Sequence, residues 1–298
     1  MTRTAVWKQI RQLKKEGYDI ESVPAKGYVF LDVPDKLFPR EIDRHLTTKW
    51  LGRAVCYEDN VASTNVLAKQ LATGDAPHGL LVVAETQGAG KGRIGRGWAS
   101  PYGKGLWFSV ILRPEFLPQE APKCTLMAAV AVCRAINRVA GVEARIKWPN
   151  DILLNGKKLV GILSEMSAEF GHVNFVVIGV GINTHAERED WPEEVQDIAV
   201  SLHSAAVKKF SRVELLAAIM QELETAFEEV SAQGFAGIFE AWRKMSCTLH
   251  KAVKVIAPDE TYYGTALDID EAGMLVVQRQ DNGKIDKVVA GDVSIRYA

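Results

Sequence analysis

The stretch Glu85-Thr-Gln-Gly-Ala-Gly-Lys-Gly-Arg-Ile-Gly-Arg-Gly-Trp98 lies between two apolar runs, residues 80–84 and 106–112. Short apolar runs that flank a glycine-rich segment are typical of buried strands joined by a loop. We therefore interpret these segments as strand, loop and strand. Both ends of the loop are then fixed by buried sheet, and the rest of the fold is built around that sheet.

The loop has the composition of an anion-binding segment. Glycine lets backbone N–H groups approach an anion, and basic side chains add charge and directed hydrogen bonds. The basic residues of the loop are Lys91, Arg93 and Arg96. It is not a P-loop, because no Gly-Lys-Ser/Thr sequence opens a helix after it. Composition alone favours a solvated surface loop, so other segments must decide.

The overall composition excludes several classes of protein. A chain of 298 residues with 47% hydrophobic and 24% charged residues is typical of a globular protein of two or three domains. A net charge of −1 gives no general attraction to nucleic acid or membrane, so any basic patch must be local. The longest apolar helical stretch is too short to span a bilayer, and the N-terminus does not have the form of a signal peptide.

Cysteine and histidine usage points to a reducing compartment without a structural metal site. The four cysteines show no CxxC spacing, which favours the cytoplasm, and the six histidines show no ligand spacing.

Residues 1–33 are predicted to form a domain of their own. Thr2 caps a helix over residues 3–16, and the strands Tyr18–Val23 and Gly27–Leu31 follow as a hairpin. One helix face is basic, with Arg3, Lys8, Arg11, Lys14 and Lys15. Helix and hairpin resemble the second half of a winged helix-turn-helix, in which the helix enters the major groove. Because roughly 20–40 residues of such a module are missing before the helix, we expect a partial domain. Either the true start lies upstream of Met1 or DNA binding has been lost; a solvated basic helix is the simpler alternative.

Residues 40–248 are predicted to form the main domain. It begins with a helix over Glu41–Lys49 and a strand over Ala54–Asn60, and a mainly buried helix spans Glu120–Ala140. In Val61-Ala-Ser-Thr-Asn65, Ser63 or Thr64 caps a helix that runs from Asn65 to Leu71. A capping role does not exclude ligand contact, since a helix N-terminus also offers hydrogen-bond donors.

The segment Lys147-Trp-Pro-Asn-Asp151 is a second candidate site. Pro149 breaks a strand there, so that Lys147 is placed to bind a phosphate and Asp151 a divalent cation. A simple Pro-Asn-Asp turn is the alternative. Asn155-Gly156 then predicts a hairpin between Ile152–Leu154 and Leu159–Met166, with Lys158 where the chain re-enters the sheet.

The remaining segments complete the domain and add a third. A strand over Asn174–Ile178 leads into Gly179-Val-Gly-Ile-Asn183, a turn whose glycines allow close ligand approach; a bulge or tight sheet packing is the alternative. Two amphipathic helices over residues 212–230 and 235–246 pack on the sheet. Residues 249–298 are predicted to form a small SH3-like β-barrel of five strands, at Ala252–Ile256, Tyr262–Ile269, Met274–Gln280, Lys284–Val289 and Val293–Tyr297.

Taken in order, five stretches resemble those of biotin protein ligases, in particular the bacterial bifunctional ligase/repressors. They are Ser63-Thr-Asn65, Glu85–Trp98, Lys147–Asp151, Lys158-Leu-Val-Gly-Ile162 and Gly179–Asn183. The resemblance implies an α+β fold with a central mixed or antiparallel sheet and helices, as in class II synthetase-like biotin and lipoate ligases. It implies an N-terminal partial winged helix and a C-terminal SH3-like barrel. It also implies ATP-dependent conversion of biotin to biotinyl-5′-AMP with Mg²⁺, and transfer of biotin to a lysine of a carboxylase's biotin carboxyl carrier protein. Operator DNA and a second copy of the chain are the further partners implied.

The resemblance also implies roles for individual residues. Those implied to contact biotin are Ser63, Thr64, Asn65, Gln87, Lys91, Gly92, Arg93, Lys158, Gly161, Gly179 and Gly181. Those implied to contact ATP or the adenylate are Arg93, Arg96, Lys147, Asn150, Asp151, Asn183 and Trp191. Lys91, Arg93 and Lys158 are the implied catalytic residues, and Asp151 the implied Mg²⁺ ligand. For Trp191, a purely buried tryptophan is an equal alternative.

Two features distinguish this chain within the resemblance, and two alternatives remain. The family usually has Arg where this chain has Lys91, which keeps the charge but loses bidentate geometry. The N-terminal domain is short. A lipoate–protein ligase is the nearest alternative, but its Arg-rich Gly-Gly-Gly stretch followed by His-Asp is absent. A DNA-binding repressor that senses a ligand without ligase activity is the other.

Overall fold

The computed structural model describes residues 2–24, 26–257, 260–290 and 294–297, the last four by their backbone. The chain forms two compact units, Met1–Lys36 and Leu37–Ala298, which we describe separately. None of the helices within these described ranges is both long and apolar enough to cross a membrane.

The first unit is one helix and one hairpin. Helix α1 (Arg3–Lys15) begins at Thr2, whose Oγ1 accepts a 3.3 Å hydrogen bond from the Ala5 backbone N–H. Strands β1 (Asp19–Val23) and β2 (Gly27–Asp32) pair antiparallel. Both predicted elements are confirmed. Every residue of β2 is exposed, whereas Tyr18 and Ile20 are buried.

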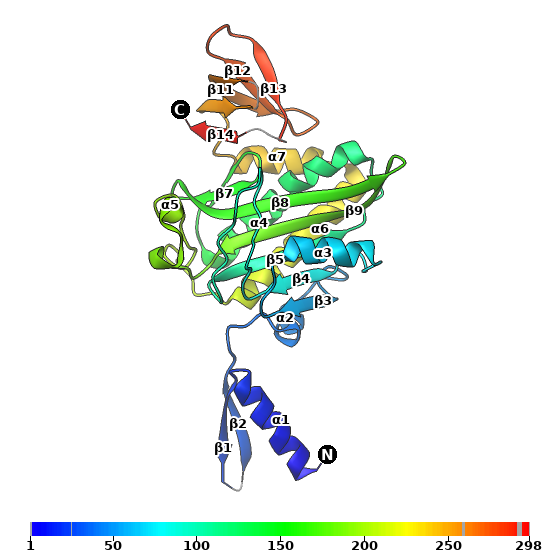
Figure 1. Ribbon diagram of the computed structural model, residues 1–298, viewed down its shortest axis with the longest axis vertical. Coiled ribbons are helices and arrows are strands. Elements are labelled where there is room, and N and C mark those ends of the chain that lie inside the picture. The colour runs from blue at the N-terminus through cyan, green and yellow to red at the C-terminus, as the bar shows by residue number, and fades with distance from the viewer. Residues whose placement is uncertain (1, 25, 258–259, 291–293, 298) are drawn as a thin grey trace. The chain divides into compact units, whose positions relative to one another are not determined.

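A mixed seven-stranded sheet forms the centre of the second unit (Figure 1). Its order is β3-β4-β5-β9-β8-β7-β6, and all neighbours are antiparallel except β3 and β4. The strands are β3 (Val55–Glu58), β4 (Leu81–Ala84), β5 (Gly105–Leu112), β6 (Arg145–Lys147), β7 (Asp151–Leu154), β8 (Lys157–Glu169) and β9 (His172–Asn183). The predicted α+β class with a mixed sheet is confirmed.

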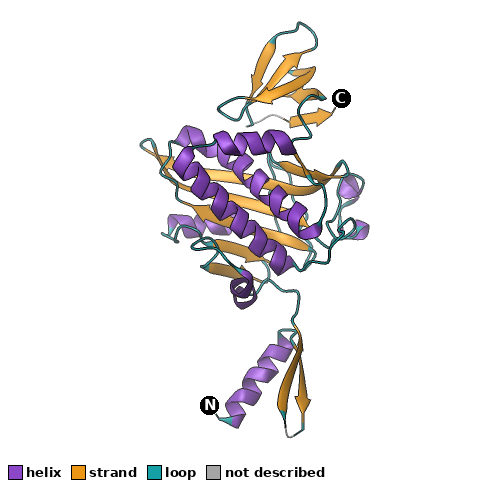
Figure 2. Cartoon of the chain, turned by 180° about the vertical axis from the view of Figure 1, so that it is seen from behind, coloured by secondary structure: helices purple, strands orange, loops and turns teal. Residues whose placement is uncertain are grey.

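Helices cover the two faces of this sheet unequally. Helices α4 (Cys124–Ala140), α6 (Arg212–Gln233) and α7 (Ala236–Met245) pack on one face, which Figure 2 shows from the helix side. Helix α3 (Thr64–Thr73) packs on the other face through Ala68 and Ala72. Because side chains alternate along a strand, Phe108 of β5 points to α4 while Ser109 points to α3. The predicted site residues lie on the α3 face. The shorter helical segments are α2 (Pro39–His45), α5 (Glu193–Gln196), η1 (Pro118–Lys123) and η2 (Arg188–Asp190).

Three element predictions differ from the structure. The first helix of the domain is α2, Pro39–His45, and does not reach Lys49. The predicted helix Glu120–Ala140 is a 3₁₀ turn followed by α4, because Pro122 has no N–H for the α-helical pattern. Residues Gly179–Asn183 are not a turn. They continue β9 and pair with both β5 and β8.

The C-terminal residues form an antiparallel sheet of five strands in the order β13-β12-β11-β10-β14. These are β10 (Ala252–Ile256), β11 (Thr261–Ile269), β12 (Leu275–Arg279), β13 (Ile285–Val288) and β14 (Ser294–Tyr297). All five predicted strands are present, although the predicted start at Val293 lies outside the described residues. Within the described ranges β13 and β14 are not paired, so the structure shows an open sheet and not a closed barrel.

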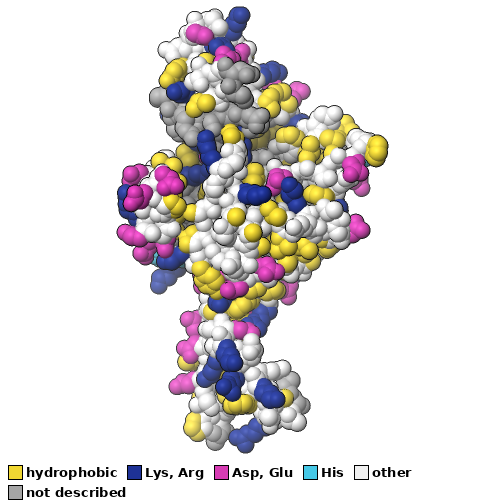
Figure 3. Space-filling view, in the orientation of Figure 1, with side chains coloured by type: hydrophobic (Ala, Val, Ile, Leu, Met, Phe, Trp, Pro, Cys, Tyr) yellow, Lys and Arg dark blue, Asp and Glu magenta, His cyan; other side chains and the backbone are white. Residues whose placement is uncertain are grey.

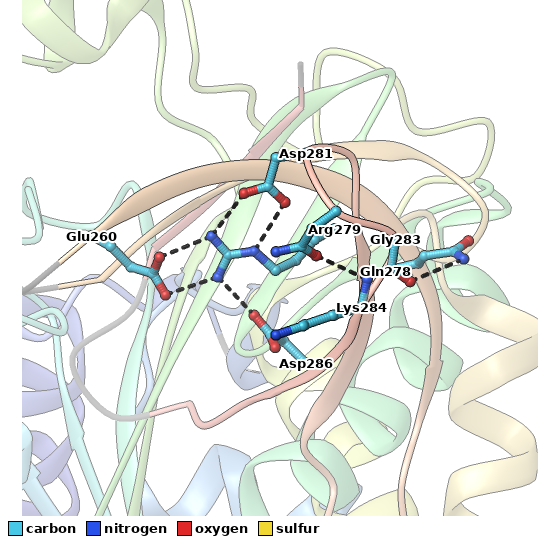
Figure 4. A network of polar contacts seen from close by, with 8 residues as sticks. Glu260, Gln278, Arg279, Asp281, Gly283, Lys284 and Asp286 are labelled. Carbon is cyan, nitrogen blue, oxygen red and sulfur yellow. Dashed lines mark hydrogen bonds and ion pairs between the residues drawn. The ribbon is translucent and has the colours of Figure 1, made fainter.

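Arg279 holds one end of this C-terminal sheet together (Figure 4). Its guanidinium lies 4.0 Å from the centre of the Tyr262 ring and makes ion pairs with Glu260, Asp281 and Asp286 at 3.0 to 3.2 Å. The hydrogen bonds that Arg279 donates to Glu260 and Asp281 raise the pKa of Arg279, so it stays charged. The single cation neutralises carboxylates from three segments that would otherwise repel one another.

A buried ion pair fixes the start of the glycine-rich loop. Glu85 directly follows β4, and its Oε2 lies 2.9 Å from Nη1 of Arg212 in α6. The side chains of Glu85 and Arg212 are 0% and 1% exposed. Glu85 also accepts a 2.8 Å hydrogen bond from the Leu37 N–H, and Arg212 donates to the carbonyl of Gly105 at 3.1 Å. The loop is therefore anchored to a helix on the opposite face of the sheet.

We predict that Glu85→Gln lowers the free energy of unfolding by about 3 kcal/mol, because Arg212 would remain buried without a counter-charge. The surface pair Arg53–Asp43, whose side chains are 40% and 71% exposed, supplies the control. Asp43→Asn should cost less than about 1 kcal/mol. Urea unfolding of both variants measures the difference, and equal losses would contradict the anchoring role of Glu85.

Candidate functional site

One cavity of about 640 Å³ opens on the α3 face of the sheet. Its walls come from the N-terminus of α3, the loop 87–99, residues 147–151, strands β8 and β9, and residues 191–199. Figure 3 shows this side of the molecule, on which Lys and Arg side chains are scattered among hydrophobic and uncharged atoms.

All residues that the sequence predicted to bind biotin or nucleotide line this cavity. They are Ser63, Thr64, Asn65, Gln87, Lys91, Gly92, Arg93, Arg96, Lys147, Asn150, Asp151, Lys158, Gly161, Gly179, Gly181, Asn183 and Trp191. They come from segments far apart in the sequence, so the fold brings together what the motifs indicated separately.

One end of the cavity is lined by buried, uncharged polar residues at the start of α3, and we call it the closed end: Ser63, Thr64 and Asn65 are each 3 to 4% exposed. Ser63 occupies the N-cap position without a side-chain capping hydrogen bond. Thr64 donates its backbone N–H to Gln87 Oε1 at 2.9 Å, and its hydroxyl lies 3.2 Å from the same oxygen. Gln87 Nε2 in turn donates to Ser100 Oγ at 2.9 Å. Thr64 and Gln87 therefore hold each other in place.

Asn65 connects α3 to three strands. Its Nδ2 donates to Leu163 O at 3.1 Å and to Glu165 Oε2 at 3.0 Å, both on β8. Its Oδ1 accepts a 2.6 Å hydrogen bond from Ser109 of β5. A Cβ atom at Gly179 of β9 would overlap Asn65 Oδ1. Glycine at this position makes room for a protein side chain.

Trp98 lies over the other two predicted glycines. A Cβ at Gly161 would come within 2.7 Å of its ring, and one at Gly181 would overlap its Nε1. Tight packing, the alternative given for Gly179–Asn183 in the sequence analysis, is thus observed at Gly179 and Gly181, and Gly161 shows it as well. Sequence analysis did not single out Trp98, Ser109 or Glu165. A lone serine within the apolar run Leu106–Leu112 was the available signal for Ser109.

The glycine-rich loop closes as a small hairpin at one side of the cavity. Gly92 N–H donates to Arg96 O at 2.7 Å, and Trp98 N–H donates to Gly90 O at 2.8 Å. Ile94 and Gly95 form the turn with φ of 55° and 68°. Positive φ is unusual for a β-branched residue, so the tip of the hairpin is strained at Ile94.

The open part of the cavity is rich in cations. Lys158 Nζ lies 2.7 Å from Asp151 Oδ1 and 5.3 Å from the centre of the Trp98 ring. Arg93 donates to Asn150 Oδ1 at 3.1 Å and also to the backbone carbonyl of Ala290. The other basic residues that line the cavity are Lys91, Arg96 and Lys147. Since cations outnumber carboxylates here, this part suits an anionic ligand.

The predicted DNA-binding residues belong to the first unit. Arg3, Lys8, Arg11, Lys14 and Lys15 are all exposed on α1. The Arg11 guanidinium lies 5.4 Å from the centre of the Trp7 ring, and Trp7 is itself 50% exposed. The helix thus presents a basic surface.

Three family profiles match separate parts of the sequence. Residues 57–183 match the biotin/lipoate A/B protein ligase family, residues 248–296 the biotin protein ligase C-terminal domain, and residues 1–29 an HTH domain.

Whole-chain comparisons agree with these matches. The chain is 42% identical to the bifunctional ligase/repressor BirA of Bacillus spizizenii over 99% of this chain and 90% of that protein. It is 33% identical to the biotin–[acetyl-CoA-carboxylase] ligase of Mycobacterium tuberculosis over 87% of this chain and 97% of that protein. The fold is similar to the biotin protein ligase from Aquifex aeolicus in complex with biotin and ATP. That match has a TM-score of 0.72 and 26% identity, and it covers 83% of this chain and all of the other.

We predict that Gly179→Ala destabilises the protein by about 2 kcal/mol, because the new methyl group would displace Asn65 from its hydrogen bonds. Gly74→Ala is the control, since a Cβ there meets only ordinary contacts at 3.6 Å. Gly74→Ala should change stability by less than about 1 kcal/mol. Urea unfolding monitored by tryptophan fluorescence compares the two. A Gly179→Ala variant as stable as the parent would show that Asn65 does not need this space.

Proposed function

We propose a role for this cavity from one premise: the chain belongs to the biotin protein ligase family. The protein is a ligase, and we propose that it activates biotin with ATP and transfers it to a lysine of a biotin carboxyl carrier protein. One observation carries the proposal. A single cavity combines a closed end of uncharged hydrogen-bonding groups with an open part rich in cations.

The closed end suits the ureido ring of biotin. A ureido group has N–H donors beside a carbonyl acceptor, and Thr64, Ser63 and Gln87 supply hydroxyl and amide partners for both. The dithiolane ring of lipoate has neither kind of group. If lipoate bound here, buried polar atoms would be left unpaired, which disfavours it strongly. The polar closed end therefore supports biotin over lipoate.

The open part suits the chemistry of acyl-adenylate formation. A carboxylate oxygen of biotin attacks the α-phosphorus of ATP, pyrophosphate leaves, and biotinyl-5′-AMP forms. Because two anions must approach each other, cations between them lower the barrier. We assign this role to Lys91, Arg93 and Lys158. In the second step the lysine amine of the carrier attacks the acyl carbonyl, the amide forms, and AMP leaves with loss of a proton.

We assign the nucleotide to the part of the cavity beyond Lys158. We assign Lys147 and Arg96 to phosphate groups, Asn150 and Asn183 to hydrogen bonds, and Trp191 to the adenine ring, because all five residues line the cavity. The Trp191 side chain is buried, with 8% exposure, so its ring face is held in a fixed orientation. Gly92, Gly161, Gly179 and Gly181 would line the biotin side.

Mg²⁺ does not have a protein-built site among the described residues. Asp151 Oδ1 is engaged by Lys158 at 2.7 Å, and the described part of the chain holds no group of three or more His, Cys, Asp or Glu that could bind a metal. A magnesium ion that accompanies ATP is normally held by phosphates and one or two carboxylates. The described residues therefore do not build a site for a resident ion, and an ion that arrives with ATP would be held mainly by its phosphates, with Asp151 as the carboxylate that we assign to it.

A second copy of the chain is a further proposed partner, and an edge of the sheet supports it. Strand β7 pairs with β8 only as far as Gly161, and Asn150 adds hydrogen bonds to Ile162. Beyond that, no described strand pairs with residues 163–169 of β8 on the side away from β9. A strand of another chain often pairs with an unpaired strand edge of this kind.

We also propose a cytoplasmic location, which the four free cysteines support.

A transfer assay tests the proposed reaction. The protein is incubated with ATP, a carboxyl carrier domain, and either labelled biotin or labelled lipoate. We expect only biotin to be transferred to the carrier lysine, because only biotin forms hydrogen bonds with the polar groups at the closed end of the cavity. Transfer of lipoate, or of neither label, would contradict the proposal.

The neighbouring lysines of β8 provide a matched pair of variants. Lys158→Ala should reduce adenylate formation about 100-fold, because a cation at the reacting carboxylate and phosphate is lost. Lys157→Ala, which removes an exposed charge one residue away, should leave the rate within about twofold of the parent. ATP–pyrophosphate exchange measures both rates. Equal rates of exchange in the two variants would show that Lys158 has no catalytic role.

DNA binding through α1 is the second function, supported by the HTH match and its exposed basic residues. Binding to operator DNA should weaken with salt, because Lys and Arg displace counterions from phosphates. Lys8→Ala should reduce the slope of log affinity against log salt by about 1. Lys209→Ala, in the other unit, is the control and should leave the slope unchanged. An unchanged slope for Lys8→Ala would exclude a phosphate contact at that residue.

A further inference from the structure

A chain of hydrogen bonds leads from the closed end of the cavity to Glu165, which does not line the cavity. It starts at Asn65, whose Nδ2 faces Glu165 Oε2 at 3.0 Å and Leu163 O at 3.1 Å. An ionised carboxylate and a backbone carbonyl only accept hydrogen bonds. The Asn65 amide therefore has one possible orientation, with Oδ1 toward Ser109.

The orientation of Asn65 determines the group to which Ser109 donates its proton. Its hydroxyl has one proton and lies 2.6 Å from Asn65 Oδ1, which is an acceptor only, so Ser109 donates to Asn65. Thr64 Oγ1 lies 2.9 Å from Ser109 Oγ and 3.2 Å from Gln87 Oε1. Ser109 has no second proton to give and the amide oxygen of Gln87 only accepts, so neither donates to Thr64, and the Thr64 proton points to one of these two protein groups. The donors run in one direction, from Ser109 to Asn65 to Glu165, so Ser109 does not occupy a lone pair of Thr64.

The direction of these hydrogen bonds determines whether Thr64 acts as a donor or an acceptor toward a ligand. Its proton is directed into the protein, so the lone pairs on its oxygen remain for the cavity that Thr64 lines. Hydrogen bonds in a chain polarise one another, and this chain ends on an anion. Thr64 thus faces the cavity as an acceptor, and it favours a ligand that presents an N–H group.

Lys69 keeps the end of the chain charged. Its Nζ lies 2.8 Å from Glu165 Oε1, the carboxylate oxygen that does not contact Asn65. Burial raises the pKa of Glu165, but the hydrogen bonds from Lys69 and Asn65 and the charges of Lys69 and Lys91 outweigh it and hold that pKa below its ordinary value. The carboxylate is thus ionised at neutral pH.

We propose that Glu165, anchored by Lys69, is a positioning residue that sets the hydrogen-bond direction of the closed end and thereby selects a head group with N–H donors. It acts through Asn65, Ser109 and Thr64 without touching the ligand. The inference rests on the proposed function, because biotin is the ligand whose ureido N–H groups Thr64 would accept.

Glu165→Gln tests the proposal with little change of shape. A glutamine offers one acceptor oxygen where glutamate offers two, so Lys69 and Asn65 can no longer both be satisfied, and the anion is gone. We expect KM for biotin to rise about tenfold, while kcat and KM for ATP stay within about twofold. KM for desthiobiotin, which keeps the ureido ring, should rise by the same factor. Glu169→Gln, at the exposed end of the same strand, is the matched control and should change none of these values.

Each outcome of this experiment decides the matter. If the parent protein does not transfer biotin, the proposed function fails and the inference fails with it. If the parent transfers biotin and Glu165→Gln has an unchanged KM for biotin, the inference alone fails. A rise in both KM values together with a lower melting temperature would show a structural role and overturn the proposal. Lys69→Met, which alters a half-buried position of α3, should also raise KM for biotin, by a smaller factor. This variant replaces Glu165→Gln as the test if Glu165→Gln does not fold.

Discussion

The buried pair of Glu85 and Arg212 is the constraint on which the site depends. Glu85 directly follows β4 and Arg212 begins α6, so their 2.9 Å contact ties the loop side of the sheet to its helical side. An isolated charge at this depth would cost several kcal/mol, so neither residue is stable there alone. Arg212 also donates to Gly105, the first residue of β5, which fixes the far end of the loop segment. With both ends held, Lys91 and Arg93 can face the cavity from a glycine-rich segment that has little packing of its own.

The floor of the cavity follows from a second constraint, the packing of large side chains directly on the backbone of β8 and β9. Asn65 needs the space over Gly179, and Trp98 needs the space over Gly161 and Gly181. A side chain at any of these glycines would push α3 or the loop away from the sheet. The polar end and the cationic part would then no longer share one cavity. The glycines line the cavity and also make room for the protein side chains that shape it.

The sequence was sufficient to predict which segments meet, and insufficient to predict how they touch. The predicted strands were accessible because hydrophobic runs, glycines and turn residues mark them locally. The mixed sheet and the roles of the cavity-lining residues were implied by the resemblance to biotin protein ligases. The continuation of β9 through Gly179–Asn183 was missed, because its two glycines resemble a turn when the pairing with β5 and β8 is unknown. Ser109 and Glu165 were missed because their partners are far away in sequence. A contact across 44 residues, such as that of Ser109 with Asn65, leaves no local pattern.

The distribution of charge along the cavity explains why a carboxylate can lie so near an anion-binding site. Glu165 would compete with an anionic ligand for Lys91, whose charge already lowers the pKa of Glu165. Lys69 removes most of this competition, because its ammonium group lies 2.8 Å from Glu165 and forms a locally neutral pair. Glu165 therefore orients the hydrogen bonds at the closed end but adds very little net negative charge to the cavity. The closed end can therefore be polarised by an anion while the cations of the loop stay available to the carboxylate and phosphate groups that react.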